Sequence, residues 1–353
     1  MMRVAIDATP LTLSSGGLAR YTAELTGALV KNFQDDVFTL MSDQPFPMPE
    51  PARNHLIRGG GARSPLERRW WFWGLNRELV RSGCQLFHGT NFEVPYVPLR
   101  ASVLTLHDLS PWMNAPWHAD AGRVRRRTPM LIELGIATMV MTPTEAARKQ
   151  AMEHFRIPAS RIAVVPYAAS EMFRPVEKNC SAPYFLYVGT LEPRKNLLEL
   201  IEVFRAVRRR HSVELVLAGR RRADFPPLPP EPGVRVLGEV GDSELPGLYS
   251  NALVFLYPSH YEGFGLPVLE AMQCGACAFI SGDAALAEVG GDAAVQLRSA
   301  SEWVQAMQAA IENPGWLREL AQRGLRRARE FSWARTARLT REVYQEALRR
   351  FSF

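Results

Sequence analysis

The sequence predicts an α/β protein of two Rossmann-like domains, each built on a doubly wound parallel sheet. Short apolar segments typical of buried strands alternate with segments of helical periodicity, and this alternation favours parallel sheets covered by helices. The alternation stops at residues 166–178, which carry no strong period, and then starts again. A chain of 353 residues also suits two domains better than one.

The first half of the chain predicts an N-terminal domain over residues 1–170. A helix is expected over residues 18–30, after a glycine pair, and another after the capping residue Thr144 through Phe155. Apolar segments predict strands, in chain order, at residues 3–6, 37–41, 86–88, 103–106, 136–141 and 162–165.

The second half predicts a further domain over residues 171–331. A helix is expected at residues 197–210, and three helical stretches end the chain, the last of them starting near the capping residue Ser332 and forming a separate terminal segment, 332–353. Strands are predicted at residues 184–188, 213–218, 234–237, 253–257, 276–281 and 293–297. Because open α/β sheets bind ligands at the carboxyl ends of their strands, a hinge between the domains predicts a ligand-binding cleft.

One stretch of the second domain, residues 259–272, carries the strongest chemical signal. It follows an apolar strand and joins a glycine-bearing loop to a short helix that begins near Pro267. Gly263 and Gly265 let the backbone turn sharply and approach a ligand. The free N–H groups at the helix start favour an anion, and the carboxylates of Glu262 and Glu270 can accept hydrogen bonds from sugar hydroxyls.

The string Y-E-G-F-G-L-P-V-L-E-A-M at residues 261–272 resembles the E-x7-E element of the retaining glycosyltransferases of family 4, which have the GT-B fold. The resemblance implies that Glu262 holds the donor sugar and that Glu270 holds the ribose of the nucleotide. It also implies donor contacts from the loop between them, formed by Gly263, Phe264, Gly265 and Leu266. A strand–helix unit with two solvated glutamates is the alternative interpretation.

The string G-T-L-E-P-R-K-N at residues 189–196 follows the first strand of the second domain and resembles the diphosphate site of the family. Cationic side chains at a helix start can neutralise a diphosphate. Lys195 is therefore expected to bind it, with Gly189 and Thr190 beside it. Many members carry an arginine at the position of Thr190, so Arg194 either substitutes for that arginine or points elsewhere.

Two strings of the first domain also resemble family segments. G-G-L-A-R-Y at residues 16–21 resembles the N-terminal glycine loop, which implies that Gly16 and Gly17 approach the donor. T-L-H-D-L-S-P at residues 105–111 resembles the segment that contacts the donor sugar, which implies a contact from His107, with Asp108 orienting it or the loop. His88 has a similar placement at a strand end and either lines the acceptor side or is structural.

The remaining resemblances lie in the second domain and at the end of the chain. L-G-E-V-G-D-S-E-L at residues 237–245 resembles the segment that borders the nucleotide base, which implies backbone contacts from Gly238 and Val240. The alternative for this segment is a loop with a helix cap. The F-S-W string at residues 331–333 resembles the start of the family's terminal helix, which implies a helix that crosses back and packs on the N-terminal domain.

The resemblance implies a retaining hexosyltransferase that uses a nucleotide sugar and needs neither a cofactor nor a metal. The strings around His107 and Thr190 look most like those of mannosyl- and rhamnosyltransferases of bacterial surface-polysaccharide assembly, which favours GDP-mannose as the donor and a saccharide or lipid-linked saccharide as the acceptor. No acidic D-x-D pair suited to magnesium is present in the sequence. Metal ligands are therefore expected to be absent.

Other function classes are weighed against this interpretation. A GT-B epimerase would need its own cluster of acidic and histidine residues, and a phosphorylase would need a longer chain and a lysine for pyridoxal phosphate. A nucleic-acid-binding or scaffolding protein could use the net charge of +6 and the pI near 9.3. That alternative predicts no affinity for nucleotides, and we expect no nucleic-acid partner.

The start of the chain, its apolar runs and its cysteines together predict a cytoplasmic protein. The chain opens on a strand pattern, so no signal peptide is expected, and no apolar run is long enough to span a bilayer. Cys274 and Cys277 are interpreted as two buried thiols rather than a redox pair. Two basic segments, 63–81 with its tryptophans and 123–127, either contact the anionic inner face of the cell membrane or cover a sheet while their arginines stay solvated.

Overall fold

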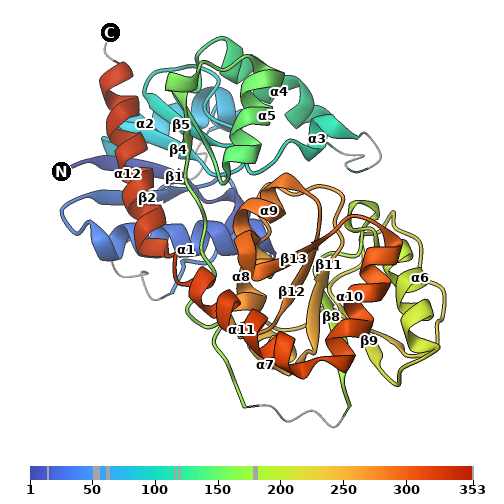
Figure 1. The fold of residues 1–353 in the computed structure, drawn as a ribbon. Helices are drawn as coiled ribbons and strands as arrows, with labels where there is room; N and C mark the ends of the chain where they lie inside the picture. Colours follow the sequence, from blue (N-terminus) through green and yellow to red (C-terminus); the bar gives the residue numbers. More distant parts are fainter. Residues whose placement is uncertain are drawn as a thin grey trace. The chain divides into compact units, whose positions relative to one another are not determined.

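The chain forms two compact units. The computed structural model describes residues 1–13, 16–50, 56–60, 64–114, 117, 121–177 and 182–351. Unit 1 comprises Met1–Tyr167 and Ser332–Phe353, and unit 2 comprises Ala168–Phe331. The chain thus passes from unit 1 to unit 2 between residues 167 and 168, close to the expected domain boundary after residue 170. Figure 1 shows both units as α/β structures with helices around a sheet, which confirms the predicted fold class.

Unit 1 contains a parallel sheet of seven strands in the order β3-β2-β1-β4-β5-β6-β7. Every pairing in this sheet is parallel. The strands are β1 (Arg3–Asp7), β2 (Val37–Met41), β3 (Ile57–Arg58), β4 (Leu86–Gly89), β5 (Ala101–Thr105), β6 (Met139–Thr142) and β7 (Ile162–Val164). The strands β4, β5 and β6 are buried along their whole length, as expected when helices cover both faces of a parallel sheet.

Helices from both ends of the chain complete unit 1. They are α1 (Gly17–Asn32), α2 (Leu75–Ser82), α3 (Ser110–Met113), α4 (Gly122–Glu133), α5 (Glu145–Phe155) and α12 (Trp333–Arg350), with a π-helical turn η3 (Trp70–Gly74) before α2. The side chains of Thr144 and Ser332 cap α5 and α12 as expected from the sequence. Helix α12 packs against α1 and β5 (Figure 1).

Unit 2 contains a parallel sheet of six strands in the order β10-β9-β8-β11-β12-β13. The strands are β8 (Tyr184–Val188), β9 (Glu214–Ala218), β10 (Val234–Gly238), β11 (Val254–Tyr257), β12 (Ala278–Ser281) and β13 (Ala294–Leu297). The helices are α6 (Leu197–Arg208), α7 (Leu245–Asn251), α8 (Leu266–Gln273), α9 (Ala284–Gly290), α10 (Ala300–Glu312) and α11 (Pro314–Ala328). Helix α10 lies beside α6, and α11 lies beside α8.

The strand order of each sheet defines a point where ligands are expected. In both units the chain builds outward in one direction and then returns to the other side of the first strand. The reversal falls between β1 and β4 in unit 1 and between β8 and β11 in unit 2. At such a switch point the loops that leave the two strands diverge and expose a crevice at the carboxyl edge.

Candidate active site

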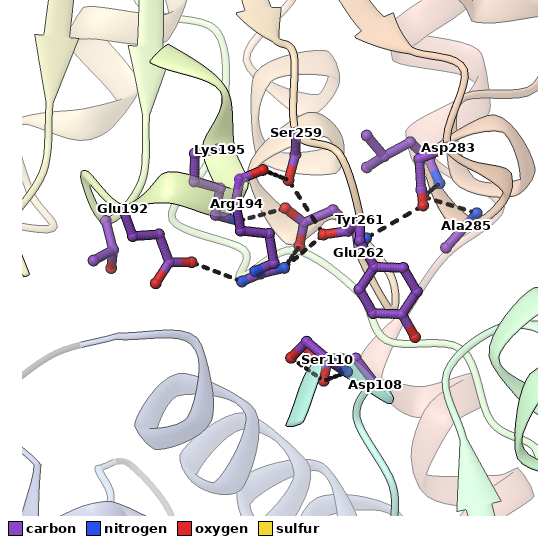
Figure 2. Close-up of polar contacts among 12 residues, drawn as sticks. Asp108, Ser110, Glu192, Arg194, Lys195, Ser259, Tyr261, Glu262, Asp283 and Ala285 are labelled. Atoms are coloured by element: carbon purple, nitrogen blue, oxygen red, sulfur yellow. Dashed lines mark hydrogen bonds and ion pairs between the residues drawn. The ribbon is translucent and has the colours of Figure 1, made fainter. Parts of the chain in front are cut away.

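The carboxyl edge of unit 2 brings together the residues that the sequence assigns to the donor. Arg194 and Lys195 lie in a short 3-10 turn, η6 (Pro193–Lys195), that follows β8. Glu262 lies in the loop between β11 and α8. Because β8 and β11 are hydrogen-bonded neighbours, these two loops meet at the switch point. Figure 2 shows the three side chains converging there.

Lys195 and Glu262 form a buried ion pair. The Nζ of Lys195 donates to Oε1 of Glu262, and it also donates to the Tyr257 hydroxyl at 2.8 Å. Burial and the neighbouring charge of Arg194 lower the pKa of Lys195. Burial alone would raise the pKa of Glu262, but the charges of Arg194 and Lys195 outweigh it and lower that pKa to about 2. Glu262 is therefore ionised and accepts hydrogen bonds at any physiological pH.

Arg194 lies between two carboxylates. Its Nη1 donates to Oε2 of Glu262 at 3.1 Å and to the carbonyl oxygen of Tyr261 at 2.6 Å. Its Nη2 donates to Oε1 of Glu192 at 2.9 Å, and the other oxygen of Glu192 accepts from Arg222 at 3.1 Å. The charges therefore alternate along the carboxyl edge from Arg222 to Lys195.

Backbone geometry fixes the loop that carries Glu262. Gly265 precedes α8 with φ near 99°, and a Cβ built there would lie 2.5 Å from a methyl carbon of Leu286. A residue with a side chain would be strained in this conformation. The backbone N–H of Glu262 donates to Asp283 at 3.3 Å, and Asp283 also caps α9 through Ala285 and Leu286. Asp283 thereby joins the Glu262 loop to the next helix.

Glu270 lies inside α8 and is 1% exposed. Its Oε2 accepts from the hydroxyl of Tyr249 on α7 at 3.0 Å. The glutamate assigned to the ribose is therefore held in a defined rotamer by a neighbouring helix. Between the two glutamates, Gly263 and Phe264 are buried, and the ring of Phe264 meets Phe331 edge to face, whereas Leu266 is partly exposed.

The remaining predicted contacts lie at the start of the loop after β8, for the diphosphate, and in the loop after β10, for the base. Gly189 has a positive φ of 151°, and the next residue, Thr190, accepts from the Tyr187 hydroxyl through its carbonyl oxygen at 3.0 Å. Gly238 ends β10 with φ near 74°, and a Cβ built there would touch no described atom. Val240 lines a cavity of about 740 Å³, together with residues of α7 and of strands β8–β10. Neither Lys195 nor Glu262 lines that cavity.

His107 lies just after β5 in unit 1, and both of its ring nitrogens have protein partners. Nε2 donates to the carbonyl oxygen of Thr90 at 2.6 Å, which leaves Nδ1 to accept from the Tyr167 hydroxyl at 2.7 Å. Burial lowers the pKa of His107, so the neutral ring is favoured. The carboxylate of Asp108 accepts from the backbone N–H and the hydroxyl of Ser110, and therefore orients the loop.

The other predicted positions of unit 1 differ in exposure. Gly16 precedes α1 with φ near 113° and Gly17 begins the helix, and no described atom would touch a Cβ at either position. His88 is fully buried, and burial lowers its pKa to about 3. Its ring bonds Thr105 and the hydroxyl of Tyr344 at 2.7 Å each, so of its two interpretations the structure favours the structural one.

The described residues offer neither a metal site nor a membrane span. They contain no group of three or more His, Cys, Asp or Glu side chains placed to hold a metal ion. Cys274 and Cys277 are both buried, as the thiol interpretation expects, and Cys180 lies outside the described residues. No described helix has the length and apolar character that crossing a bilayer requires.

Sequence reasoning missed several residues that shape the site. Glu192 belongs to the diphosphate string, but its pairing with Arg194 and Arg222 depends on the conformation of the loops after β8 and β9. Tyr257 lies in an apolar strand pattern of the sequence, and its hydroxyl contact with Lys195 depends on packing. Asp283 precedes a helix in a pattern typical of a cap, but its second contact, with Glu262, has no local signal.

Comparisons with known proteins agree across the chain. Residues 15–168 match the family model described as Glycosyltransferase Family 4, and residues 169–330 match the model described as Glycosyl transferases group 1. The O-antigen chain mannosyltransferase B of Escherichia coli is 34% identical over 285 residues, which cover 74% of this chain and 74% of that protein.

Solved structures show the same fold. A sucrose-phosphate synthase from Thermosynechococcus elongatus superposes with a TM-score of 0.76 at 19% identity, covering 98% of each chain. HepE of Anabaena, solved in complex with UDP-glucose, gives a TM-score of 0.72 at 16% identity, covering 98% of this chain and 99% of that one. The predicted resemblance is thus confirmed: this chain belongs to glycosyltransferase family 4 and is a glycosyltransferase of the GT-B fold.

Proposed function

We propose that this glycosyltransferase transfers a hexose from a nucleotide sugar to a saccharide or lipid-linked saccharide, with GDP-mannose as the favoured donor. The observation that carries the proposal is the buried pair of Lys195 and Glu262 at the switch point of unit 2. It combines a cation suited to phosphate with a carboxylate suited to sugar hydroxyls. The relative named as a mannosyltransferase supports mannose as the sugar, and the neighbour solved with UDP-glucose supports a nucleotide-sugar donor.

Four of the predicted residues receive chemical roles in this proposal. Lys195 and the N-terminal end of α8 neutralise the diphosphate, whereas Glu270 accepts from the ribose hydroxyls. Glu262 holds the hexose, and the Nε2–H of His107, which now donates to a carbonyl oxygen, donates to a sugar oxygen instead. Negative charge grows on the phosphate as its bond to the sugar breaks. A cation in this position therefore stabilises the transition state more than the ground state.

The proposed reaction retains the anomeric configuration. The bond between the sugar C1 and the phosphate oxygen breaks, and the acceptor hydroxyl forms its bond to C1 on the same face. The acceptor proton passes to an oxygen of the departing phosphate, so the products are the glycoside and a nucleoside diphosphate. In this scheme the protein supplies positioning and electrostatic stabilisation, without forming a covalent bond to the sugar.

The donor is identified by measuring nucleoside diphosphate release from a panel of GDP- and UDP-sugars. The proposal expects release from GDP-mannose to exceed release from every other donor tested, and it expects no loss of activity in excess chelator because Lys195 and the start of α8 supply the positive charge. Faster release from a UDP-sugar would contradict the choice of donor. Loss of activity in chelator, restored by magnesium or manganese, would contradict metal independence.

A specific observation also favours contact between unit 1 and an anionic membrane, where a lipid-linked acceptor would be found. In η3 the ring of Trp70 is buried, but Phe72 is 45% exposed and Trp73 is 52% exposed. Arg127 of the second basic segment donates to the Tyr96 hydroxyl at 2.5 Å, and the Tyr96 ring packs on Phe72. The two segments therefore form one surface of aromatic and basic side chains, a composition suited to a bilayer interface.

Sedimentation with anionic liposomes at low salt tests this contact. The wild type should sediment with the vesicles, and the binding should weaken as salt rises. The double variant Phe72→Ser/Trp73→Ser should bind less, as should Arg126→Ala, whose side chain is exposed, unlike those of Arg125 and Arg127. Leu198→Ser in unit 2, at a leucine that is 51% exposed, is the control. A wild type that stays in the supernatant would contradict the contact.

A further inference from the structure

Arg194 contacts four consecutive residues of the loop that carries Glu262. Its carbonyl oxygen accepts from the Ser259 hydroxyl at 3.4 Å and from the His260 backbone N–H at 2.9 Å. Its Nη1 donates to the carbonyl oxygen of Tyr261 at 2.6 Å and to the carboxylate of Glu262 at 3.1 Å. The backbone and the side chain of Arg194 thus hold the segment between β11 and Gly263 in place (Figure 2).

The outer side of the same guanidinium is held by Glu192. This carboxylate is 6% exposed and accepts from Nη2 of Arg194 at 2.9 Å, and it is itself held by Arg222. A planar guanidinium can satisfy acceptors on two sides at once because its N–H groups point in fixed directions. Arg194 therefore bridges the loop after β8 and the loop after β11.

Lys195 differs from its neighbour in the kind of partners it has. Its partners are two side-chain oxygens, those of Glu262 and Tyr257. A phosphate oxygen can replace such partners when a ligand arrives, and the ammonium group keeps its position through the ring of Tyr257, whose centroid lies 4.9 Å from Nζ. In Arg194, by contrast, one partner is a backbone carbonyl of the loop itself. Releasing that contact would free the loop.

We infer that Arg194 is a positioning residue for Glu262, and that binding of the donor diphosphate depends on Lys195 and not on Arg194. This inference rests on the proposed function and refines it. The guanidinium holds the Glu262 loop in the conformation that presents the carboxylate to the hexose, and Glu192 holds the guanidinium. Arg194 thereby affects sugar transfer through the loop, whereas the nucleoside diphosphate binds without it.

The test compares nucleoside diphosphate binding with turnover in Arg194→Lys. Lysine keeps the charge but cannot bridge Glu192, Tyr261 and Glu262 together. We expect the Kd for GDP or UDP, whichever the wild type binds, to stay within about threefold of the wild type, and kcat to fall by about 100-fold. Amide hydrogen exchange in residues 259–262 should become faster, while exchange in β12 stays the same.

Two further variants complete the design. Arg205→Lys is the matched control, because Arg205 donates through Nε and Nη2 to Glu231 on a different part of unit 2, and it should change neither measurement. Glu192→Gln leaves the loop contacts in place and removes the charge on the outer side of Arg194. It should lower kcat with an unchanged Kd, and it tests the inference if Arg194→Lys fails to fold.

The outcomes separate the inference from the function on which it rests. A tenfold or larger loss of nucleoside diphosphate affinity in Arg194→Lys would overturn the inference and make Arg194 a diphosphate ligand. Unchanged kcat and unchanged exchange in residues 259–262 would overturn it as well. If the wild type binds no nucleoside diphosphate, the proposed function fails instead, and the exchange measurement alone still decides whether Arg194 holds the loop.

Discussion

Lys195 carries the clearest prediction for a single residue because its buried ammonium group lies beside Glu262 and Tyr257. Lys195→Ala removes the cation that opposes the charge growing on the phosphate. We expect kcat/KM to fall by the equivalent of about 2–4 kcal/mol, the range typical for loss of one electrostatic donor. Lys149→Ala, at an exposed lysine of unit 1, is the control. Turnover at the wild-type rate in Lys195→Ala would show that the diphosphate is held elsewhere.

Asp7 predicts a pH dependence of stability. It ends β1, is 2% exposed and accepts from the Thr9 backbone N–H, yet burial raises its pKa to about 6. Since its pKa is higher in the folded state than in the unfolded state, its contribution to stability is present below about pH 4 and is lost as pH rises through 6.

The variant Asp7→Asn removes this titration. Relative to the wild type, it should gain on the order of 2 kcal/mol in the free energy of unfolding between pH 4 and pH 7, since each pKa unit corresponds to about 1.4 kcal/mol. Chemical denaturation at both pH values measures the difference. Asp35→Asn, at an exposed carboxylate of the same unit, should show no such change. A difference that is constant with pH would mean that Asp7 is not protonated on folding.

At the scale of elements, the turn from β11 into α8 depends on Gly265. Its φ near 99° and the contact of 2.5 Å that a Cβ would make with Leu286 both oppose a side chain. Gly265→Ala should therefore lower the free energy of unfolding by about 1–3 kcal/mol. It should also weaken nucleoside diphosphate binding, because the start of α8 would move.

Gly247 provides the matched control for this prediction. It lies inside α7, and a Cβ there would touch no described atom. Gly247→Ala should be neutral or stabilising by up to about 1 kcal/mol, since alanine favours the helix. Thermal unfolding of the two variants makes the comparison. Equal effects at the two glycines would contradict the role given to the Gly265 conformation.

The elements also show where sequence reasoning succeeds and where it fails. The predicted strands at residues 37–41 and 184–188 agree with β2 and β8, because buried parallel strands leave uninterrupted apolar runs. Helix α4 was not predicted, since it contains Pro129, which normally ends a helix. The strand predicted at residues 136–141 begins only at Met139, because residues before it close α4, with the Ala137 N–H donating to Leu131.

At the scale of the whole molecule, the sequence predicts the two Rossmann-like units and the loops that carry the site, because strand alternation and glycine-bearing loops are local features. It also predicts that Glu262 and Lys195 share one edge of a sheet, which the strand order of unit 2 confirms. The alternation of charges from Arg222 through Glu192 and Arg194 to Glu262 could not be predicted. Those contacts join three separate loops, and no local sequence pattern predicts which side chains of different loops meet.

The anomeric configuration of the product tests the central claim most directly. The donor that gives the fastest nucleoside diphosphate release is incubated with the enzyme and an acceptor, and the one-bond carbon–hydrogen coupling at C1 of the new glycoside is measured by NMR. A sugar that keeps the configuration it had in the donor is the predicted result, because departure of the phosphate and attack by the acceptor occur on one face. A product with the opposite configuration would contradict the account.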